Sequence, residues 1–225
     1  MRNTTIKVLL SILCLVTFDA NAQQKTTNQQ KKDTMTLPAT TNQNSLSAQE
    51  REDAIKFLEE TKSELFRAIR NLKNNQITFK GDTEKWSIEE CVKHIAAAET
   101  TLWAIVEESL KQPANPEKRE QIKFNDRELI NAVKDRTHKS NTFSALEPAN
   151  SPYKTWNEAM ESFEENREKL ILFVKNTKDD LRNHVSVLPI GTYDAYQLIL
   201  LISAHTNRHT QQIQQVKEDI NFPKD

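Results

Sequence analysis

The amino-acid sequence predicts an all-α protein, a four-helix bundle with one long connection between its second and third helices. Only two glycines, Gly81 and Gly191, occur among 225 residues, which leaves little from which to build tight hairpin turns or phosphate-binding loops. Four segments carry apolar residues at helical spacing, and no convincing strand lies between them. The composition, 36% hydrophobic and 28% charged, is that of a globular domain with one core.

The first 22 residues have the three parts of a secretory signal peptide. Arg2 and Lys7 supply positive charge, an apolar run occupies 8–18, and Ala20 and Ala22 form a small-x-small cleavage pattern. The apolar run is too short to span a bilayer. We therefore expect cleavage after Ala22, a periplasmic or secreted location, and no stable membrane insertion of the mature chain.

Cysteine content limits covalent stabilisation. Cys14 lies in the apolar run, but the bulky Leu13 before it disfavours a lipid anchor at this position. Once the signal peptide is removed, Cys91 is the only cysteine left, so no internal disulfide can form. The fold must be held by its core.

Charge excludes one class of partner. The full chain carries a net charge of -1; the signal peptide contributes +1, from Arg2 and Lys7 against Asp19, so the mature chain carries -2. There is no basic surface typical of nucleic-acid binding. We expect no nucleic-acid partner.

Residues 23–45 form a polar spacer. They are almost entirely Gln, Asn, Thr, Lys and Ser, and cannot bury enough apolar surface to offset the entropy of ordering. We predict disorder here, with a tether to an envelope partner as the alternative. The helical domain is predicted to occupy 46–220.

The first two helices each begin with a capping box, a serine followed three residues later by glutamate. Ser47 and Glu50 open the first helix, which the apolar spacing extends to about Asn74. Ser87 and Glu90 open the second, whose alanines permit close approach of a neighbouring helix and which the following prolines end.

The connection from 112 to 152 is unusually long for a bundle. It contains one predicted short helix at 126–139. A connection of this length lets the chain cross over, so we do not expect the third helix to pair simply antiparallel with the second.

The third and fourth helices follow this crossover. The third is predicted from about Pro152 to Lys175, on the spacing of its aromatic and aliphatic residues. The fourth is predicted to begin after a turn, with Thr192 or Asp194 as its cap, and to continue to Glu218.

Two histidines on the fourth helix predict a metal site. His205 and His209 are four residues apart, so they share one helix face at the spacing two imidazoles need to hold one ion. His94, on the second helix, is the best candidate for a third ligand. Three protein ligands would leave an open position, the layout of a reactive metal centre. The alternative is that each of the three is an ordinary histidine, partly exposed or hydrogen-bonded.

Glu90 lies one turn before His94 and is the nearest carboxylate on the same helix face. It is our candidate catalytic base, or a partner that orients His94, and its capping role is the alternative. Residues 206–208 are Thr, Asn and Arg, so the His-Glu-x-x-His pattern of metalloproteases is absent.

Four other residues are assigned more ordinary roles. Cys91 could supply a thiolate ligand, but we favour core packing. Gln212 would line the pocket or hydrogen bond within the core. His138 and His184 lie in polar connections and are not expected to bind metal.

The order and spacing of these motifs resemble the DinB/YfiT-like superfamily over roughly 46–219. The matching residues are Trp86, Ser87, Glu90, His94, His205, His209 and Gln212. The resemblance implies an up-down-down-up bundle in which the three histidines bind a divalent metal, commonly zinc or nickel, with water in the open position. It also implies a small-molecule substrate, since members include metal-dependent hydrolases and transferases that use a low-molecular-weight thiol. Export and the long 112–152 connection set this chain apart from the usual pattern.

The leading hypothesis is therefore an exported metal-dependent hydrolase or thiol-dependent transferase. A non-enzymatic envelope protein, with a structural metal or a helical surface that binds a partner, is the alternative. A third interpretation assigns the amphipathic helices to a homodimer interface.

Overall fold

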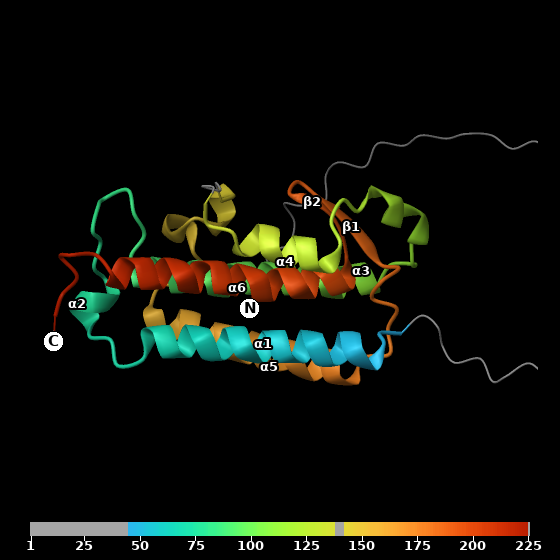
Figure 1. The fold of residues 1–225 in the computed structure, drawn as a ribbon, viewed down its shortest axis with the longest axis horizontal. Helices are drawn as coiled ribbons and strands as arrows, with labels where there is room; N and C mark the ends of the chain where they lie inside the picture. The colour runs from blue at the N-terminus through green and yellow to red at the C-terminus, as the bar shows by residue number, and fades with distance from the viewer. Residues whose placement is uncertain (1–44, 138–141, 225) are drawn as a thin grey trace, which may run out of the picture. The chain divides into compact units, whose positions relative to one another are not determined.

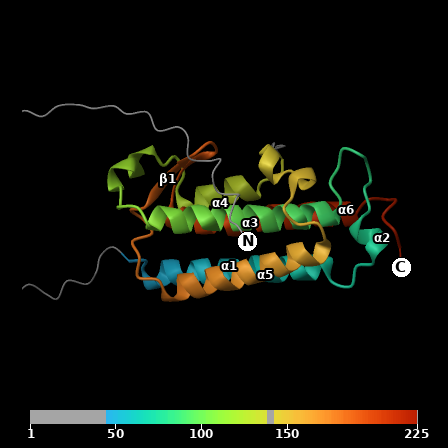
Figure 2. The same ribbon diagram turned by 180° about the vertical axis from the view of Figure 1, so that it is seen from behind.

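The described part of the chain is mostly helical. The computed structural model describes residues 45–137 and 142–224. Its four long helices are α1 (Ala48–Ile69), α3 (Ile88–Leu110), α5 (Trp156–Asn176) and α6 (Ala195–Lys217). They lie side by side, and each of α1 and α3 contacts both α5 and α6 (Figures 1 and 2). The prediction of a mostly helical fold built on four long helices is confirmed.

Side-chain caps fix where the long helices begin. Ser47 and Ser87 each accept the backbone N–H of the glutamate three residues on, and each glutamate accepts the serine N–H in return. Thr155 and Glu158 do the same for α5, so this helix begins at Trp156 rather than near Pro152. Of the two predicted caps of α6, Asp194 holds the position, accepting from Gln197 N at 2.7 Å.

Two further helix boundaries differ from the sequence prediction. Helix α1 ends at Ile69, and a short helix, α2 (Asn74–Ile77), occupies the segment predicted to close it. Helix α4 (Asp126–Lys134) is shorter than the predicted 126–139. It stops because Asp135 takes an extended backbone conformation.

A β-hairpin precedes α6, so the expectation of no strand was wrong. Strands β1 (Val185–Leu188) and β2 (Gly191–Asp194) pair antiparallel through a two-residue turn. Gly191 has φ +138°, a conformation that L side chains rarely adopt. Scarcity of glycine did not prevent a hairpin because one glycine at this position is enough.

The long connection wraps one side of the bundle. Its described residues, 112–137 and 142–152, contain α4 and three short 3₁₀ turns: η1 (Pro116–Gln121), η2 (Ser144–Leu146) and η3 (Pro148–Asn150). Helix α4 packs along α6, while η2 and η3 pack against α3 (Figure 1). The crossover thus covers the two helices that carry the candidate metal ligands.

The interior contains a buried ion pair as well as an apolar core. Apolar side chains of all four long helices fill the interior, among them Leu58, Ile95, Phe163, Leu170, Leu198 and Ile199. Among them Arg167 donates to both carboxylate oxygens of Glu99 at 2.7 Å. It also donates to Leu58 O, Thr61 Oγ1 and Thr206 Oγ1, at 2.8–2.9 Å. All five N–H groups of this guanidinium therefore have acceptors.

The two predicted N-terminal segments fall largely outside this description. The proposed signal peptide, 1–22, and nearly all of the polar spacer, 23–45, lie outside the described residues. Within the described residues, none of the helices has the length and hydrophobicity needed to cross a bilayer.

Candidate metal centre

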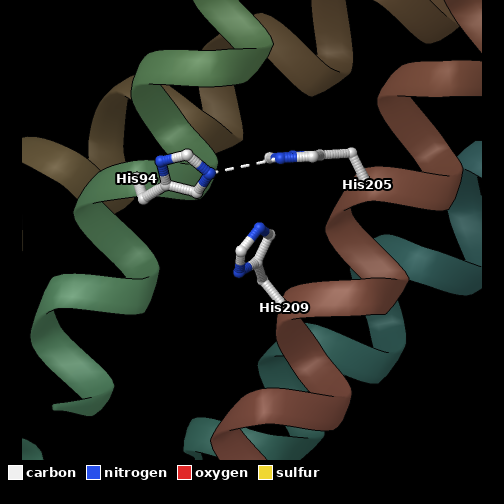
Figure 3. A group of neighbouring side chains, drawn as sticks. All are labelled: His94, His205 and His209. Carbon is white, nitrogen blue, oxygen red and sulfur yellow. Dashed lines mark hydrogen bonds between the residues drawn. The ribbon is translucent and has the colours of Figure 1, made fainter. Parts of the chain in front are cut away.

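The structure brings the three predicted ligands together. His94 lies on α3, nearly two turns after its serine cap, and His205 and His209 lie on successive turns of α6. Because α3 packs against α6, the imidazoles from the two helices face one another (Figure 3). Among the described residues, these three form the group whose ligand atoms all lie within 4.8 Å of one another.

The spacing of the ring nitrogens fits a metal ion. His94 Nε2 and His205 Nε2 are 3.2 Å apart, as the dashed line in Figure 3 marks. Two nitrogens that each lie about 2.05 Å from a tetrahedral ion are separated by about 3.3 Å. The rings of His94 and His205 both have centroids 4.5 Å from that of His209. A single divalent ion is therefore compatible with this donor set.

Hydrogen bonds orient two of the three rings. His94 Nδ1 lies 2.7 Å from Leu146 O and can only donate to this carbonyl, which leaves Nε2 as a lone-pair donor to metal. His209 Nδ1 lies 3.0 Å from Gln212 Oε1, with the same consequence. An outer acceptor on the second ring nitrogen is the usual arrangement around metal-binding histidines.

Burial keeps the rings neutral. It lowers the pKa of His94, against a smaller opposing effect of the hydrogen bond to Leu146. Burial, with the charges of His94 and Arg208, lowers the pKa of His205 to about 3. Burial and the two neighbouring histidines also hold the pKa of His209 well below its usual value. Neutral imidazole is the form that binds metal, so the ligands are ready at neutral pH.

Trp86 covers one side of the cluster. Its ring stacks on His209 with centroids 5.9 Å apart and an interplanar angle of 16°, and it lies 4.9 Å from the His94 ring. His94 and His209 are buried, whereas His205 remains partly exposed. Access to the cluster is therefore on the His205 side.

Glu90 lies in the capping box, not among the histidines. Its carboxylate accepts the Ser87 N–H at 2.7 Å and pairs with Lys80 at 3.1 Å. Leu146 O, rather than Glu90, accepts from the His94 ring, so the orienting role suggested for this glutamate was wrong. A role as catalytic base stays a prediction.

The four residues that were given more ordinary roles in the sequence analysis can be placed as follows. Cys91 is fully buried in the core, and burial raises the pKa of its thiol, which fits the packing role. Gln212 hydrogen bonds to His209. His184 lies near Ser109 O, beside the hairpin. His138 lies outside the described residues.

Two contributions to the site were missed in the sequence analysis. The Leu146 carbonyl is a backbone group in a polar connection, and no side-chain pattern marks it. Trp86 was noted only as part of the motif that opens its helix; an aromatic residue just before a helix cap that leads to a metal ligand was the available signal.

The fold and the site together define a helical-bundle protein with a candidate three-histidine metal centre. The sequence model of the DinB superfamily matches residues 57–213, more than half of the chain, and the chain belongs to this superfamily.

Two Bacillus subtilis proteins are similar to it. YuaE, an uncharacterized protein of strain 168, is 24% identical over 164 residues, which make up 72% of this chain and 95% of YuaE. YfiT, whose solved structure is described as a probable metal-dependent hydrolase with an unusual four-helix bundle topology, aligns with a TM-score of 0.54 and 14% identity. The alignment covers 82% of this chain and 95% of YfiT, and at this identity it supports the fold alone.

Proposed function

We propose that this chain is an exported metal-dependent enzyme, a hydrolase or thiol-dependent transferase acting on a small molecule. The observation that carries the proposal is the convergence of three neutral imidazoles, with His94 Nε2 and His205 Nε2 3.2 Å apart. Membership of the DinB superfamily, and the description of YfiT as a probable metal-dependent hydrolase, support the same class.

Different residues of the chain would bind the metal ion and orient its ligands. His94, His205 and His209 would hold a divalent ion such as zinc or nickel, with Leu146 and Gln212 fixing two of the rings. When bound, such an ion lowers the pKa of a bound water or thiol and supplies a nucleophile near neutral pH. Three protein ligands leave a coordination position for that nucleophile.

The surroundings of the histidines would select and orient the substrate. Trp86 shields the buried side of His94 and His209, so a substrate would approach from the partly exposed His205. Glu90 remains the proposed proton acceptor, and it would first have to release Lys80.

Two further parts of the proposal concern topology and location. We infer an up-down-down-up order of the four long helices, supported by the course of the colours along them in Figures 1 and 2. We also propose that the signal-like segment 1–22 directs the protein to the periplasm or outside the cell, on the strength of its sequence pattern.

A non-enzymatic protein with a structural metal is the second candidate. The observation in its favour is the burial of His94 and His209, with exposed fractions of 2% and 8%. A structural ion would have no exchangeable water, and stripping it would unfold the bundle. Retention of helical circular dichroism after chelation therefore favours the enzyme.

Metal content tests the proposal. The chain from Gln23, purified without a histidine tag, is incubated with zinc or nickel, desalted and analysed by inductively coupled plasma mass spectrometry. We expect about one equivalent of metal per chain, lost in His94→Ala, His205→Ala and His209→Ala. His184→Ala is the matched control and should keep the metal, because His184 contacts Ser109 O near the hairpin. Full stoichiometry in all three site variants would refute the proposal.

A further inference from the structure

Arg136 lies directly beyond α4, against the helix that carries two of the candidate ligands. Its Nη1 donates to Arg208 O and Gln212 Oε1, both at 3.4 Å, and its Nη2 donates to Gln215 Oε1 at 3.0 Å. Packing of α4 along α6 holds it there. The side chain is neither a free surface arginine nor part of the core.

The charge of Arg136 has no counterpart in the described part of the chain. All three of its acceptors are neutral amide or peptide oxygens. Its Nε is buried and has no hydrogen-bond partner. A guanidinium half-removed from water normally takes a carboxylate, because charge-assisted pairs offset the loss of hydration. Arg136 is therefore under-satisfied as a donor.

Two other guanidinium groups of the fold, one buried and one half-buried, pair with carboxylates. Arg167 pairs with both oxygens of Glu99. Arg182 pairs with Glu50, Asp126 and Asp194 at 2.6–3.2 Å. Arg136 differs from both in having only neutral acceptors, and an anion would supply the charged partner that it lacks.

One side chain links Arg136 to the metal centre. Gln212 Oε1 lies 3.4 Å from Arg136 Nη1 and 3.0 Å from His209 Nδ1, so it accepts from the guanidinium and from the ring together. Burial, with the charge of the nearby Arg208, lowers the pKa of Arg136. Asp135, the carboxylate adjacent in sequence to Arg136, accepts from Thr137 N and Oγ1, and Glu90 pairs with Lys80.

We propose that Arg136 binds a carboxylate of the small molecule whose reacting group occupies the three-histidine centre. This inference rests on the proposed function and gives its substrate class, a carboxylic acid. The planar guanidinium presents N–H groups at the spacing of two carboxylate oxygens. Gln215, an exposed neutral acceptor, is the partner that a charged carboxylate would displace.

A pair of probes isolates the carboxylate. Acetohydroxamate and N-hydroxysuccinamate bind metal through the same hydroxamate group, and the second adds a distal carboxylate. Isothermal titration of the nickel-loaded protein gives a dissociation constant for each. We expect the carboxylate to tighten binding about tenfold, the size of a charge-assisted pair in a partly exposed site. In Arg136→Gln this preference should disappear, and in Arg136→Lys it should be reduced because the fork geometry is lost.

Arg127→Gln is the matched control. Arg127 is an exposed residue of α4, the helix that precedes Arg136, so this variant makes the same charge change away from the cluster and should keep the preference. Equal preference in Arg136→Gln and the original protein, or no preference in the original protein, would overturn the inference. Nickel content and helical circular dichroism are measured for every variant; if Arg136→Gln does not fold, an undiminished preference in Arg136→Lys is the contradicting result.

The outcomes separate this inference from the proposed function. A nickel-loaded protein that binds both hydroxamates equally retains the metal centre and removes only the role of Arg136. A protein that takes up no metal at all removes the proposed function, and this inference with it.

Discussion

Two buried polar clusters lie on different faces of α6, and they are satisfied in opposite ways. In one, Arg167 uses all five N–H groups on protein acceptors, including Thr206 Oγ1. In the other, His205, the residue before Thr206, faces His94 with Nε2 atoms 3.2 Å apart, a hydrogen bond when the His205 ring carries its proton on Nε2 and a pair of metal-binding lone pairs when it carries the proton on Nδ1. The first cluster is completed by a paired charge, whereas the second gathers three neutral imidazoles whose nitrogens can bind an ion.

The difference separates polar groups that serve the fold from those that serve a site. A buried charge with every partner in place belongs to folding, since removing either member leaves an uncompensated charge. Converging imidazole nitrogens whose rings are held by Leu146 and Gln212 are explained by an ion. Variants of the two clusters should therefore affect stability and metal binding separately.

The largest expected effect is on stability, at the complete cluster. Arg167→Ala leaves Glu99 buried without its partner and should lower the free energy of unfolding by about 3–5 kcal/mol in urea denaturation. The double variant Arg167→Met with Glu99→Leu should recover most of this loss, because it removes both charges. If Arg167→Ala is as stable as the original protein, the ion pair with Glu99 does not stabilise the fold.

The next effect is a pH dependence confined to the metal-free protein. Burial depresses the pKa of His205 to about 3 and that of His209 well below normal, so below about pH 6.5 the unfolded chain binds protons that the folded chain does not. Stability should be unaffected above that pH and should fall as pH decreases, by at most about 3 kcal/mol from pH 7.5 to pH 5.5. Urea denaturation at the two pH values measures it. If the variant His205→Ala with His209→Ala shows the same pH dependence, the histidines are not its source.

A smaller effect should appear in metal affinity alone. Gln212→Leu removes the acceptor that orients His209 and should weaken metal binding about 10- to 100-fold, measured by competition with a chromogenic chelator. Gln214→Leu is the control, because Gln214 is exposed on the same helix. Equal affinities in the two variants would mean that the hydrogen bond to His209 has no role in holding the ion.

The smallest expected effect is again on stability, at the cluster around Arg167. Thr61→Val deletes one neutral acceptor of Arg167 and should cost about 1–2 kcal/mol of stability, with metal binding unchanged. Thr101→Val is the control. The Thr101 hydroxyl, like that of Thr61, donates to the carbonyl four residues earlier. Thr101 is exposed, so its substitution should cost less stability than that of Thr61. Equal losses of unfolding free energy in the two variants would argue against the contact with Arg167.

The sequence predicted the helices and the ligands because both depend on local spacing. Capping boxes marked the starts of α1 and α3, and the four-residue spacing of His205 and His209 placed two imidazoles on one face. The hairpin before α6 escaped prediction because strands of four residues carry too short a pattern to distinguish from a loop.

Long-range partners could not be predicted in the same way. Leu146 reaches His94 from 52 residues away, and Arg136 reaches Gln212 from 76 residues away, contacts that only the packed crossover creates. Arg167 left a signal that went unused: it lies four residues after Phe163 and three before Leu170, inside an apolar stripe where a charge requires a partner.

X-ray absorption spectroscopy at the metal edge tests the central claim most directly. For the zinc- or nickel-loaded protein, we predict three imidazole nitrogens at about 2.0–2.1 Å and an additional light-atom ligand from water. Loss of the imidazole signal in His205→Ala would place the ion at this cluster. A shell of sulfur ligands, four protein nitrogens with no water, or the same spectrum in His205→Ala would contradict an open three-histidine centre.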